Sequence, residues 1–473
     1  MQGCAKYTYH EEPIDFASVS TEINSWTIND PGLIQFLKEN DPTAESVQSN
    51  VFSINRLFLT SLYYDPAMQV AYKKWKKAKI IVELSDYKIN PELSIPFEHH
   101  SETSNGQSEW TIGAVLTFIY ERKNKQEARK AKAEVALLNA SLEINRLAFE
   151  RYGLFKEKYH AYIGRHAKLS ELRNESNVLQ ALLAQLQNKY ELGAVSQFEL
   201  NTVKLELQRS LFQLSVYENK LQGNKDELSA MTHLVHSELD TIEIEMIDSV
   251  LLTKSTYQDS EILAADFLEL QKSMLESHLD MAIKLNEYAQ SEAALRLEIE
   301  SQYPDLVLSP GFIFDQTDNI WSLGSSWILP LFENTQKNID ILTALEERKI
   351  KQQEIIVLQK KLLNALYNRH RSILRHKNTT DVSNKIINSI EQRAKEIETQ
   401  IEIGGIDGSA LLRNRIEFYK AKQEQIDIYK EAINAMLEME HLLQSSHAGI
   451  NIKKVVSSWL EHIEENNNDK LVN

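Results

Sequence analysis

Trp110-Thr111-Ile112-Gly113 and Trp321-Ser322-Leu323-Gly324 are two copies of one motif, and the copies lie 211 residues apart. A glycine turn, Gly193-Ala194-Val195-Ser196, returns at the same interval as Gly404-Gly405-Ile406-Asp407. The side chains of the copies differ, yet the distance from the tryptophan motif to the turn is the same. A repeat that keeps a distance rather than a set of reactive groups indicates a duct or a strut, not a catalytic pocket.

Long stretches between these motifs lack helix-breaking residues. Residues 97–303 and 331–473 contain no proline, and 331–403 has no glycine either. Such stretches are free to form continuous helices. We therefore predict two helices in each copy, joined by the glycine turn: about 121–192 and 197–234 in the first, about 333–403 and 408–445 in the second.

The turns carry the residues that helix ends require. Gly193 suits a left-handed end of the first helix, Ser196 suits the N-cap of the next, and Glu199 falls at the third position of a capping box. In the second copy Gly404 and Gly405 stop the helix and Asp407 restarts it.

Each returning helix also has an apolar residue at every seventh position, which predicts coiled-coil packing within each pair. These positions are Leu200, Leu207, Leu214, Leu221 and Leu228 in the first copy and Leu412, Tyr419, Ile426 and Ile433 in the second.

Two stretches alternate with a period of two and predict β-hairpins, with strands at about 91–100 and 109–120 and at about 304–315 and 320–332. One face of each strand is apolar and the other is small or polar. A lipid-facing strand has this alternation, and so does a strand of a soluble sandwich. Trp110, Trp321 and Trp327 fit an interfacial aromatic belt. Because open strand edges are not tolerated in lipid, four strands in a membrane would require oligomerisation.

The predicted organisation follows the repeats. It consists of an extended N-terminal segment at 1–50, which a lipid on Cys4 would anchor, a first repeat at 51–257, a second repeat at 258–447 and a tail at 448–473. The fold class is mainly α with a small β part, in which long antiparallel helical hairpins hang from β-hairpins.

Composition excludes some classes of function. The net charge of −16 lacks the basic footprint of a nucleic-acid binder. No run of 18 apolar residues occurs. A single cysteine, Cys4, excludes an internal disulfide. Its context, Gly3-Cys4-Ala5, looks like the end of a bacterial lipoprotein signal, which would make Cys4 a lipidation site; an ordinary thiol is the alternative.

No pattern of catalytic or cofactor-binding residues occurs in the sequence. A nucleophile elbow, a phosphate loop, a zinc signature and a dinucleotide fingerprint are all missing. His99-His100 lies in a polar loop, where a solvated pair is the favoured interpretation over a metal site. We therefore predict a protein that is not an enzyme and that carries no cofactor and no metal.

The order and spacing of several short motifs resemble the TolC-like outer-membrane efflux proteins, and most nearly the lipid-anchored factors of heavy-metal and drug pumps. The resemblance covers most of the chain. Besides the repeated motifs and turns quoted above, it is carried by Cys4-Ala5-x-Tyr7, Asn90-Pro91-Glu92-Leu93, Tyr303-Pro304-Asp305-Leu306 and Leu329-Pro330-Leu331-Phe332.

The resemblance implies a homotrimer in the bacterial outer membrane. Each subunit would give four strands to a shared twelve-stranded barrel in lipid and its helices to a periplasmic tunnel. The turns, residues 193–196 and 404–407, would contact a periplasmic adaptor and an inner-membrane pump. Family members often carry acidic residues after the second turn, where this chain has Ala410 and Arg413, so metal export is not assumed.

The leading hypothesis is a passive exit duct of a tripartite efflux system. Two alternatives stay open: the duct of a type I protein secretion system, and a coiled-coil scaffold outside the membrane. The transported substrate does not follow from the sequence.

Overall fold

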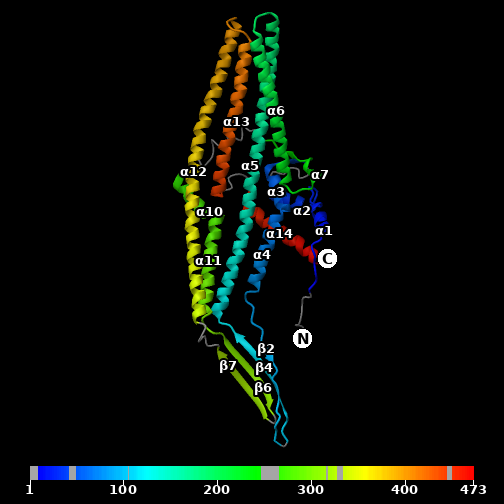
Figure 1. Ribbon diagram of the computed structural model, residues 1–473, viewed down its shortest axis with the longest axis vertical. Helices are drawn as coiled ribbons and strands as arrows, with labels where there is room; N and C mark the ends of the chain where they lie inside the picture. Colours follow the sequence, from blue (N-terminus) through cyan, green and yellow to red (C-terminus); the bar gives the residue numbers. More distant parts are fainter. Residues whose placement is uncertain are drawn as a thin grey trace. The chain divides into compact units, whose positions relative to one another are not determined.

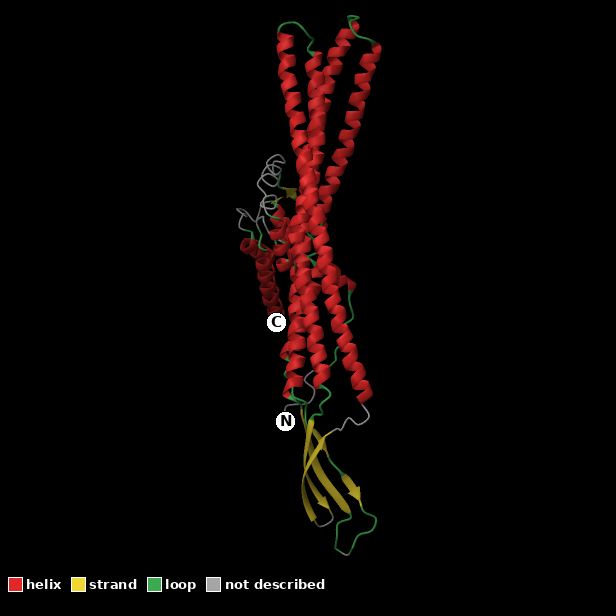
Figure 2. Ribbon diagram, turned by 90° about the vertical axis from the view of Figure 1, so that its left-hand side faces the viewer, coloured by secondary structure: helices red, strands yellow, loops and turns green. Residues whose placement is uncertain are grey.

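A computed structural model shows the arrangement of the chain (Figures 1 and 2). The structure describes residues 9–41, 50–104, 106–246, 266–315, 318–327, 334–444 and 450–472. Within these ranges, no helix combines the length and the apolar character needed to cross a membrane. Cys4, the predicted strand beyond Trp327 and the motif at 329–332 lie outside the described residues.

The chain forms two compact units, and both contain parts of each repeat. The first unit combines Met1–Met68, Leu147–Met274 and Leu363–Asn473, and the second combines Gln69–Arg146 with Leu275–Leu362. The expected division at 257/258 therefore does not separate compact units. The reason is physical: helices of the two repeats pack on each other within one unit, as the ion pair of Lys156 on α5 (Lys123–Glu191) with Glu440 on α13 (Ser409–Leu443) shows.

Two very long helices have the same length. Helix α5 spans Lys123–Glu191 and α12 spans Asn334–Glu402, and each has 69 residues. Both their first and their last residues are separated by 211 positions, the interval of the sequence motifs. The helix bounds predicted from the proline-free stretches are about 121–192 and 333–403. Each predicted bound lies within two residues of the observed one.

In the first unit, four helices lie in a row in the order α6, α5, α13, α12. Helix α6 spans Gln197–Ala230 and α13 spans Ser409–Leu443. Ion pairs mark the neighbours: Lys158 with Glu227 between α5 and α6, Lys156 with Glu440 between α5 and α13, and Arg369 with Glu438 between α12 and α13. Along α6 and α13, none of the predicted heptad residues is exposed, and Leu207, Leu228 and Ile433 are buried.

Shorter elements of the first unit pack beside this row. They are α1 (Phe16–Ile23), α2 (Pro31–Asn40), α3 (Ile54–Tyr64), α7 (His236–Leu239), α10 (Phe267–Ser277), α14 (Ile452–Val472) and the parallel pair β1 (Val51–Phe52) and β5 (Glu243–Ile244). Phe58 on α3 meets Tyr152 and Phe155 of α5, with ring centroids 4.9 and 6.3 Å apart. Trp459 of α14 is fully buried.

The prediction of an extended segment at 1–50 was wrong where the structure describes it, because α1 and α2 are helical. Asp15 and Asp30 cap them, each accepting hydrogen bonds from two backbone N–H groups. Pro31 occupies the first turn of α2, where its missing N–H costs nothing. Asp30-Pro31 is therefore a helix start.

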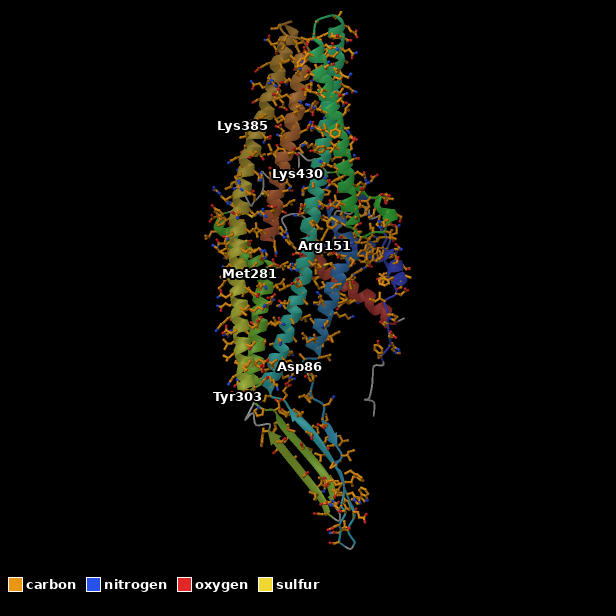
Figure 3. All side chains as sticks on the ribbon, in the orientation of Figure 1. Asp86, Arg151, Met281, Tyr303, Lys385 and Lys430 are labelled. Carbon is orange, nitrogen blue, oxygen red and sulfur yellow. The ribbon has the colours of Figure 1, made fainter. Side chains whose placement is uncertain are left out.

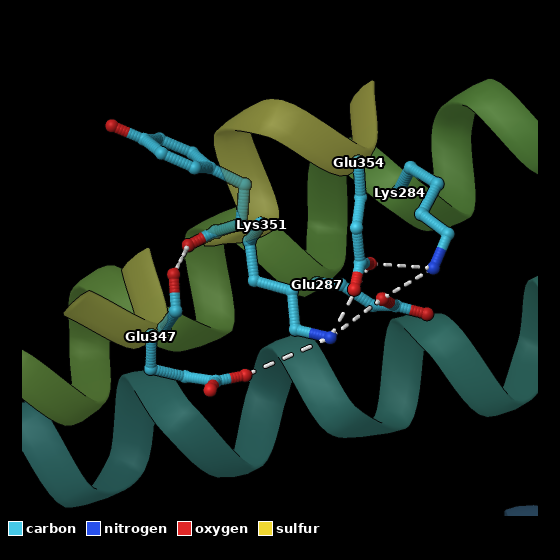
Figure 4. Close-up of polar contacts among 7 residues, drawn as sticks. Lys284, Glu287, Glu347, Lys351 and Glu354 are labelled. Carbon is cyan, nitrogen blue, oxygen red and sulfur yellow. Dashed lines mark hydrogen bonds and ion pairs between the residues drawn. The ribbon is translucent and has the colours of Figure 1, made fainter. Parts of the chain in front are cut away.

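The second unit contains the first parts of α5 and α12 together with α4 (Pro66–Glu83) and α11 (Leu279–Glu300). Figure 4 shows how α11 and α12 are joined: the Lys284 ammonium lies 2.9 Å from Glu287 and 2.9 Å from Glu354. Lys351 approaches the same two carboxylates at 3.3 and 3.4 Å. Hydrogen bonds from Lys284 lower the pKa of Glu354, so this carboxylate stays charged at neutral pH.

All strands of the second unit are antiparallel and form one sheet. The predicted first strand is interrupted near Pro96 and forms β2 (Glu92–Ser94) and β3 (Phe97–His99), which both pair with β4 (Trp110–Tyr120). Proline lacks the N–H that a ladder requires, which explains the interruption. Strand β4 pairs with β6 (Leu306–Asp315), and β6 pairs with β7 (Asp318–Trp327). The two predicted hairpins thus meet through β4 and β6.

On the first half of β4 the apolar side chains are exposed and the polar face is buried, whereas on β7 both faces are exposed. Trp321 and Leu323 on β7 are 80% and 76% exposed, whereas Thr111 on the polar face of β4 is 6% exposed. Thr111 donates a hydrogen bond of 2.5 Å to Asp315 and lies 2.8 Å from the ring Nε2 of His100. An antiparallel sheet in water normally buries its apolar face. Exposed apolar side chains on such a sheet indicate a contact with a nonaqueous neighbour.

Candidate functional site

The two glycine turns have the same backbone geometry. Gly193 and Gly404 have φ values of +72° and +75°. The N–H of Ala194 donates to the carbonyl of Lys189 at 2.8 Å, and the N–H of Gly193 donates to that of Tyr190 at 2.9 Å. This pair of bonds is a Schellman motif, which satisfies the last carbonyls of a helix.

The second turn repeats both bonds at positions shifted by 211. The N–H of Gly405 donates to the carbonyl of Gln400 at 2.8 Å, and that of Gly404 donates to Ile401 at 3.0 Å. An ideal Cβ built on Gly193 or Gly404 meets no heavy atom within 4 Å. Glycine is therefore required by the left-handed backbone and not by crowding.

Helix α6 begins with the side-chain cap Ser196, whereas the N-cap of α13 is Gly408, one residue after Asp407. The Ser196 hydroxyl accepts from the N–H of Glu199 at 3.2 Å, as half of the predicted capping box. At the second turn, the Asp407 carboxylate accepts from the N–H of Ser409 at 3.2 Å. The Glu199 side chain instead accepts from Arg413 at 2.6 Å. Capping alone thus does not account for Glu199.

Two ion pairs connect the first turn to the second. Lys189 at the end of α5 pairs with Asp407, and Arg413 on α13 pairs with Glu199 on α6. Hydrogen bonds from Lys189 and then from Ser409 lower the pKa of Asp407 to about 2. The two pairs contain equal numbers of acids and bases. Because Arg413 is paired with the Glu199 carboxylate, its positive charge is neutralised at this end of the bundle.

An apolar cluster supports the turns from within. Leu186 of α5, Val203 and Leu207 of α6 and Ile416 of α13 are buried together, and Val195 of the first turn packs against them. The hairpins are thus joined by apolar packing as well as by charge. This packing makes the end of the unit a single structure that carries both turns.

The same end exposes apolar side chains that the sequence analysis did not single out. Leu192 and Ile403, which occupy equivalent positions just before the glycines, are 83% and 71% exposed, and Phe198 on α6 is 82% exposed. The sequence signal that could have indicated this surface is the apolar residue that precedes the glycine in both turns. Together with Ile406, these side chains give the turns an apolar surface of the kind that marks a contact with another molecule.

The predicted belt residues lie at different levels of the sheet. Trp321 stands opposite Phe312 and Trp327 opposite Leu306, six residues apart along β6. The Trp110 ring stacks on Phe97 with centroids 4.7 Å apart. All three tryptophans are exposed on their strands. The three tryptophans therefore lie at three levels along the sheet, and their place in an aromatic belt stays a prediction.

The histidine pair contacts neighbouring side chains of β4. His99 lies against the Trp110 ring, with centroids 4.4 Å apart, and His100 contacts Thr111. Among the described residues, no group of three or more His, Cys, Asp or Glu side chains is arranged to hold a metal ion. Cys4 lies outside the described residues, so its lipidation stays a prediction.

Comparison with solved structures identifies the fold. VceC, an outer membrane protein from Vibrio cholerae, matches with a TM-score of 0.63 at 14% identity, over 82% of this chain and 95% of that chain. The CmeC outer membrane channel of Campylobacter jejuni matches with a TM-score of 0.57 at 13% identity, over 86% and 89%. The chain has the fold of these outer-membrane proteins.

A third match is the open state of the MtrE outer membrane channel of Neisseria gonorrhoeae, with a TM-score of 0.59 at 10% identity, over 82% of this chain and 88% of that chain. No family model matches the sequence, and a search of curated proteins found no match. The likeness is therefore one of fold.

Proposed function

We propose that the chain is one subunit of a trimeric outer-membrane duct that gives passive exit to cargo in a tripartite efflux system. The observation that carries the proposal is the set of exposed apolar side chains on the sheet, among them Trp321 and Leu323. Lipid is the neighbour that such a surface fits. The shared fold with outer-membrane channels supports the same location and disfavours a scaffold outside the membrane.

The dimensions of the sheet suit a membrane. Strand β4 has 11 residues, and the ten steps from Trp110 to Tyr120 correspond to about 34 Å at about 3.4 Å per residue. At a tilt of about 40° this spans about 26 Å, close to the apolar band of about 25 Å in outer-membrane barrels. Trp110 at one end and Trp327 at the other would then lie near the two interfaces.

Oligomerisation follows from the edges of the sheet. Within the described residues, β7 pairs on one side alone, as do β2 and β3. Unpaired edges are costly in lipid, so neighbouring subunits must satisfy them. Three copies of four strands would give the twelve-stranded barrel that the resemblance implies.

The glycine turns are the proposed docking surface for a periplasmic adaptor and, through it, an inner-membrane pump. Leu192, Phe198 and Ile403 supply exposed apolar contacts, and the ion pairs hold both turns together. A conducting role needs no reactive group, so the proposal assigns no chemistry to the chain.

A matched pair of substitutions tests the membrane assignment. Leu323→Arg places a charge on the apolar face, whereas Ser322→Arg places the same charge on the neighbouring position of the polar face. An arginine facing the middle of the membrane costs about 2–4 kcal/mol. We expect Leu323→Arg to deplete the protein from outer-membrane fractions and Ser322→Arg to be tolerated. Equal effects would refute a lipid-facing apolar side.

The oligomeric state has its own measurement. Light scattering of the detergent-extracted wild-type chain should give a protein mass three times the 54.5 kDa of one chain. A stable monodisperse monomer would contradict the proposal. If the trimer forms but purifies with a polypeptide-secretion pump, the duct serves secretion rather than efflux.

A further inference from the structure

A pocket of about 430 Å³ lies between α5, α6 and α13 in the first unit. Its basic residues are Lys158 and Arg165 on α5, Lys220 on α6 and Lys430 on α13, and Lys430 is labelled in Figure 3. The volume falls in the range of pockets that hold small molecules. The proposed duct function rests on the sheet and the turns and does not involve this pocket.

The charge of the pocket is opposite to that of the chain. Four basic residues face two acidic ones, Glu157 and Glu227, although the whole chain carries a net charge of −16. Lys158 and Glu227 neutralise each other at 2.5 Å. Arg165, Lys220 and Lys430 therefore outnumber the one remaining carboxylate, so the pocket has an excess of positive charge.

The guanidinium of Arg165 is held in place. Its Nη1 donates to the backbone carbonyl of Lys220 at 3.3 Å and to the side-chain oxygen of Asn224, which is 6% exposed. Both bonds use Nη1, which leaves Nε and Nη2 for a ligand. A fixed planar guanidinium suits the two oxygens of a phosphate or carboxylate group.

Gly223 leaves the wall of the pocket open. It lies within α6, and an ideal Cβ there meets no heavy atom within 4 Å. Glycine inside a helix costs about 1 kcal/mol relative to alanine. Neither crowding nor a left-handed backbone explains the residue. The free space beside Gly223 is contiguous with the basic residues of the pocket.

Two side chains of α5 that contact the shorter elements are not part of the pocket lining. Phe155 and Tyr159 face the shorter elements, since Phe155 contacts Phe58 of α3 and the Tyr159 hydroxyl donates to the carbonyl of Glu245 at 2.8 Å. Arg165 lies six residues beyond Tyr159, on another face of the helix, because six residues are well short of two full turns. Among the described residues, the lining of the pocket comes from α5, α6 and α13 and not from the shorter elements.

We propose that this pocket binds a multivalent oxyanion, the phosphate or carboxylate groups of a small molecule. Arg165 would donate two hydrogen bonds to two oxygens of the anion, and Lys220 and Lys430 would add positive charge. The Asn434 amide lines the same pocket. The proposal does not require that the chain conducts cargo, and it is tested by binding alone.

The test is calorimetric titration of the purified full-length chain in detergent with inorganic pyrophosphate and, separately, with citrate. We expect saturable binding of at least one of them, and the comparison tells whether phosphate or carboxylate is preferred. Lys430→Gln should weaken the binding about tenfold to 100-fold, the range for losing a charged hydrogen-bond partner. Lys385→Gln on α12, which removes an exposed lysine outside the pocket, should leave it unchanged.

A second variant tests the place of binding independently. Gly223→Glu puts a carboxylate into the open space among the basic residues, so it should abolish binding while the circular dichroism of the helices is retained. Absence of saturable binding of both anions by the wild-type chain would overturn the proposal. Equal binding by the wild-type and Lys430→Gln chains would overturn it too. If Gly223→Glu does not fold, Lys430→Gln decides.

Discussion

Replacing the turn glycines by alanine should destabilise the protein, whereas the same change inside a helix should stabilise it. Gly193 and Gly404 have φ values of +72° and +75°, and an L-residue in this region costs about 1–2 kcal/mol. An added Cβ meets no atom within 4 Å at either position, so no steric cost is added. The double variant should therefore lose about 2–4 kcal/mol per subunit.

Gly164 in α5 is the matched control. Its Cβ would also meet no atom within 4 Å, but its backbone is helical. Alanine there should add about 0.5–1 kcal/mol, because glycine loses more conformational freedom on folding. The two substitutions are chemically the same and differ in the backbone region they occupy.

Denaturant titrations of the purified protein, followed by circular dichroism of the helices, measure the difference. The midpoint should fall for Gly193→Ala with Gly404→Ala and rise for Gly164→Ala. The reasoning is refuted if the turn variant is as stable as the wild type or more stable, since the left-handed backbone would then not determine the cost.

Four further outcomes are expected. Gly193→Val with Gly404→Val should leave the trimer in the outer membrane but abolish export and adaptor crosslinking; full export would show that the turns are not the contact surface. Because the pKa of Asp407 is lowered to about 2, its ion pair with Lys189 persists above pH 4 and is lost as the pH falls through 2. This half-exposed pair contributes less than about 1 kcal/mol to stability, so its loss is better followed by the distance between spin labels on the two turns than by unfolding. The distribution of that distance should broaden between pH 4 and pH 2, and the distribution for Asp407→Asn should be broad at every pH. Mass spectrometry of protein made with an upstream signal should find acylated Cys4, and an unmodified thiol would refute lipidation. Brominated lipid should quench tryptophan fluorescence less in Trp321→Phe than in the wild type, and equal quenching would place Trp321 outside the lipid.

Local patterns in the sequence predicted the long helices and their turns. Proline-free stretches and a glycine before a serine or aspartate define helix ends through backbone chemistry alone, which is why α5 and α12 lie so close to the predicted bounds. Alternation likewise predicted β4 and β6. Pro31 shows the limit of such patterns. A proline can end a helix or begin one, and the residue before it decides which.

Contacts between distant segments were not predictable in the same way. The pair of Glu199 with Arg413 joins residues 214 positions apart, and a charged residue on a helix surface gives no signal of its partner. The polar residues of the Arg165 pocket come from three helices. Only the register of those helices brings them together, and neither composition nor periodicity specifies that register.

The equal lengths of α5 and α12 limit how this sequence can change. Deleting one residue from α5 alone would move the first turn by about 1.5 Å and rotate it by about 100° relative to the second. Lys189 would then face away from Asp407. Side chains along the two helices can diverge, as the repeats show, but an insertion or deletion in one helix needs a matching change in the other. Among homologues, substitutions should therefore be frequent in these helices, and length changes should occur in pairs.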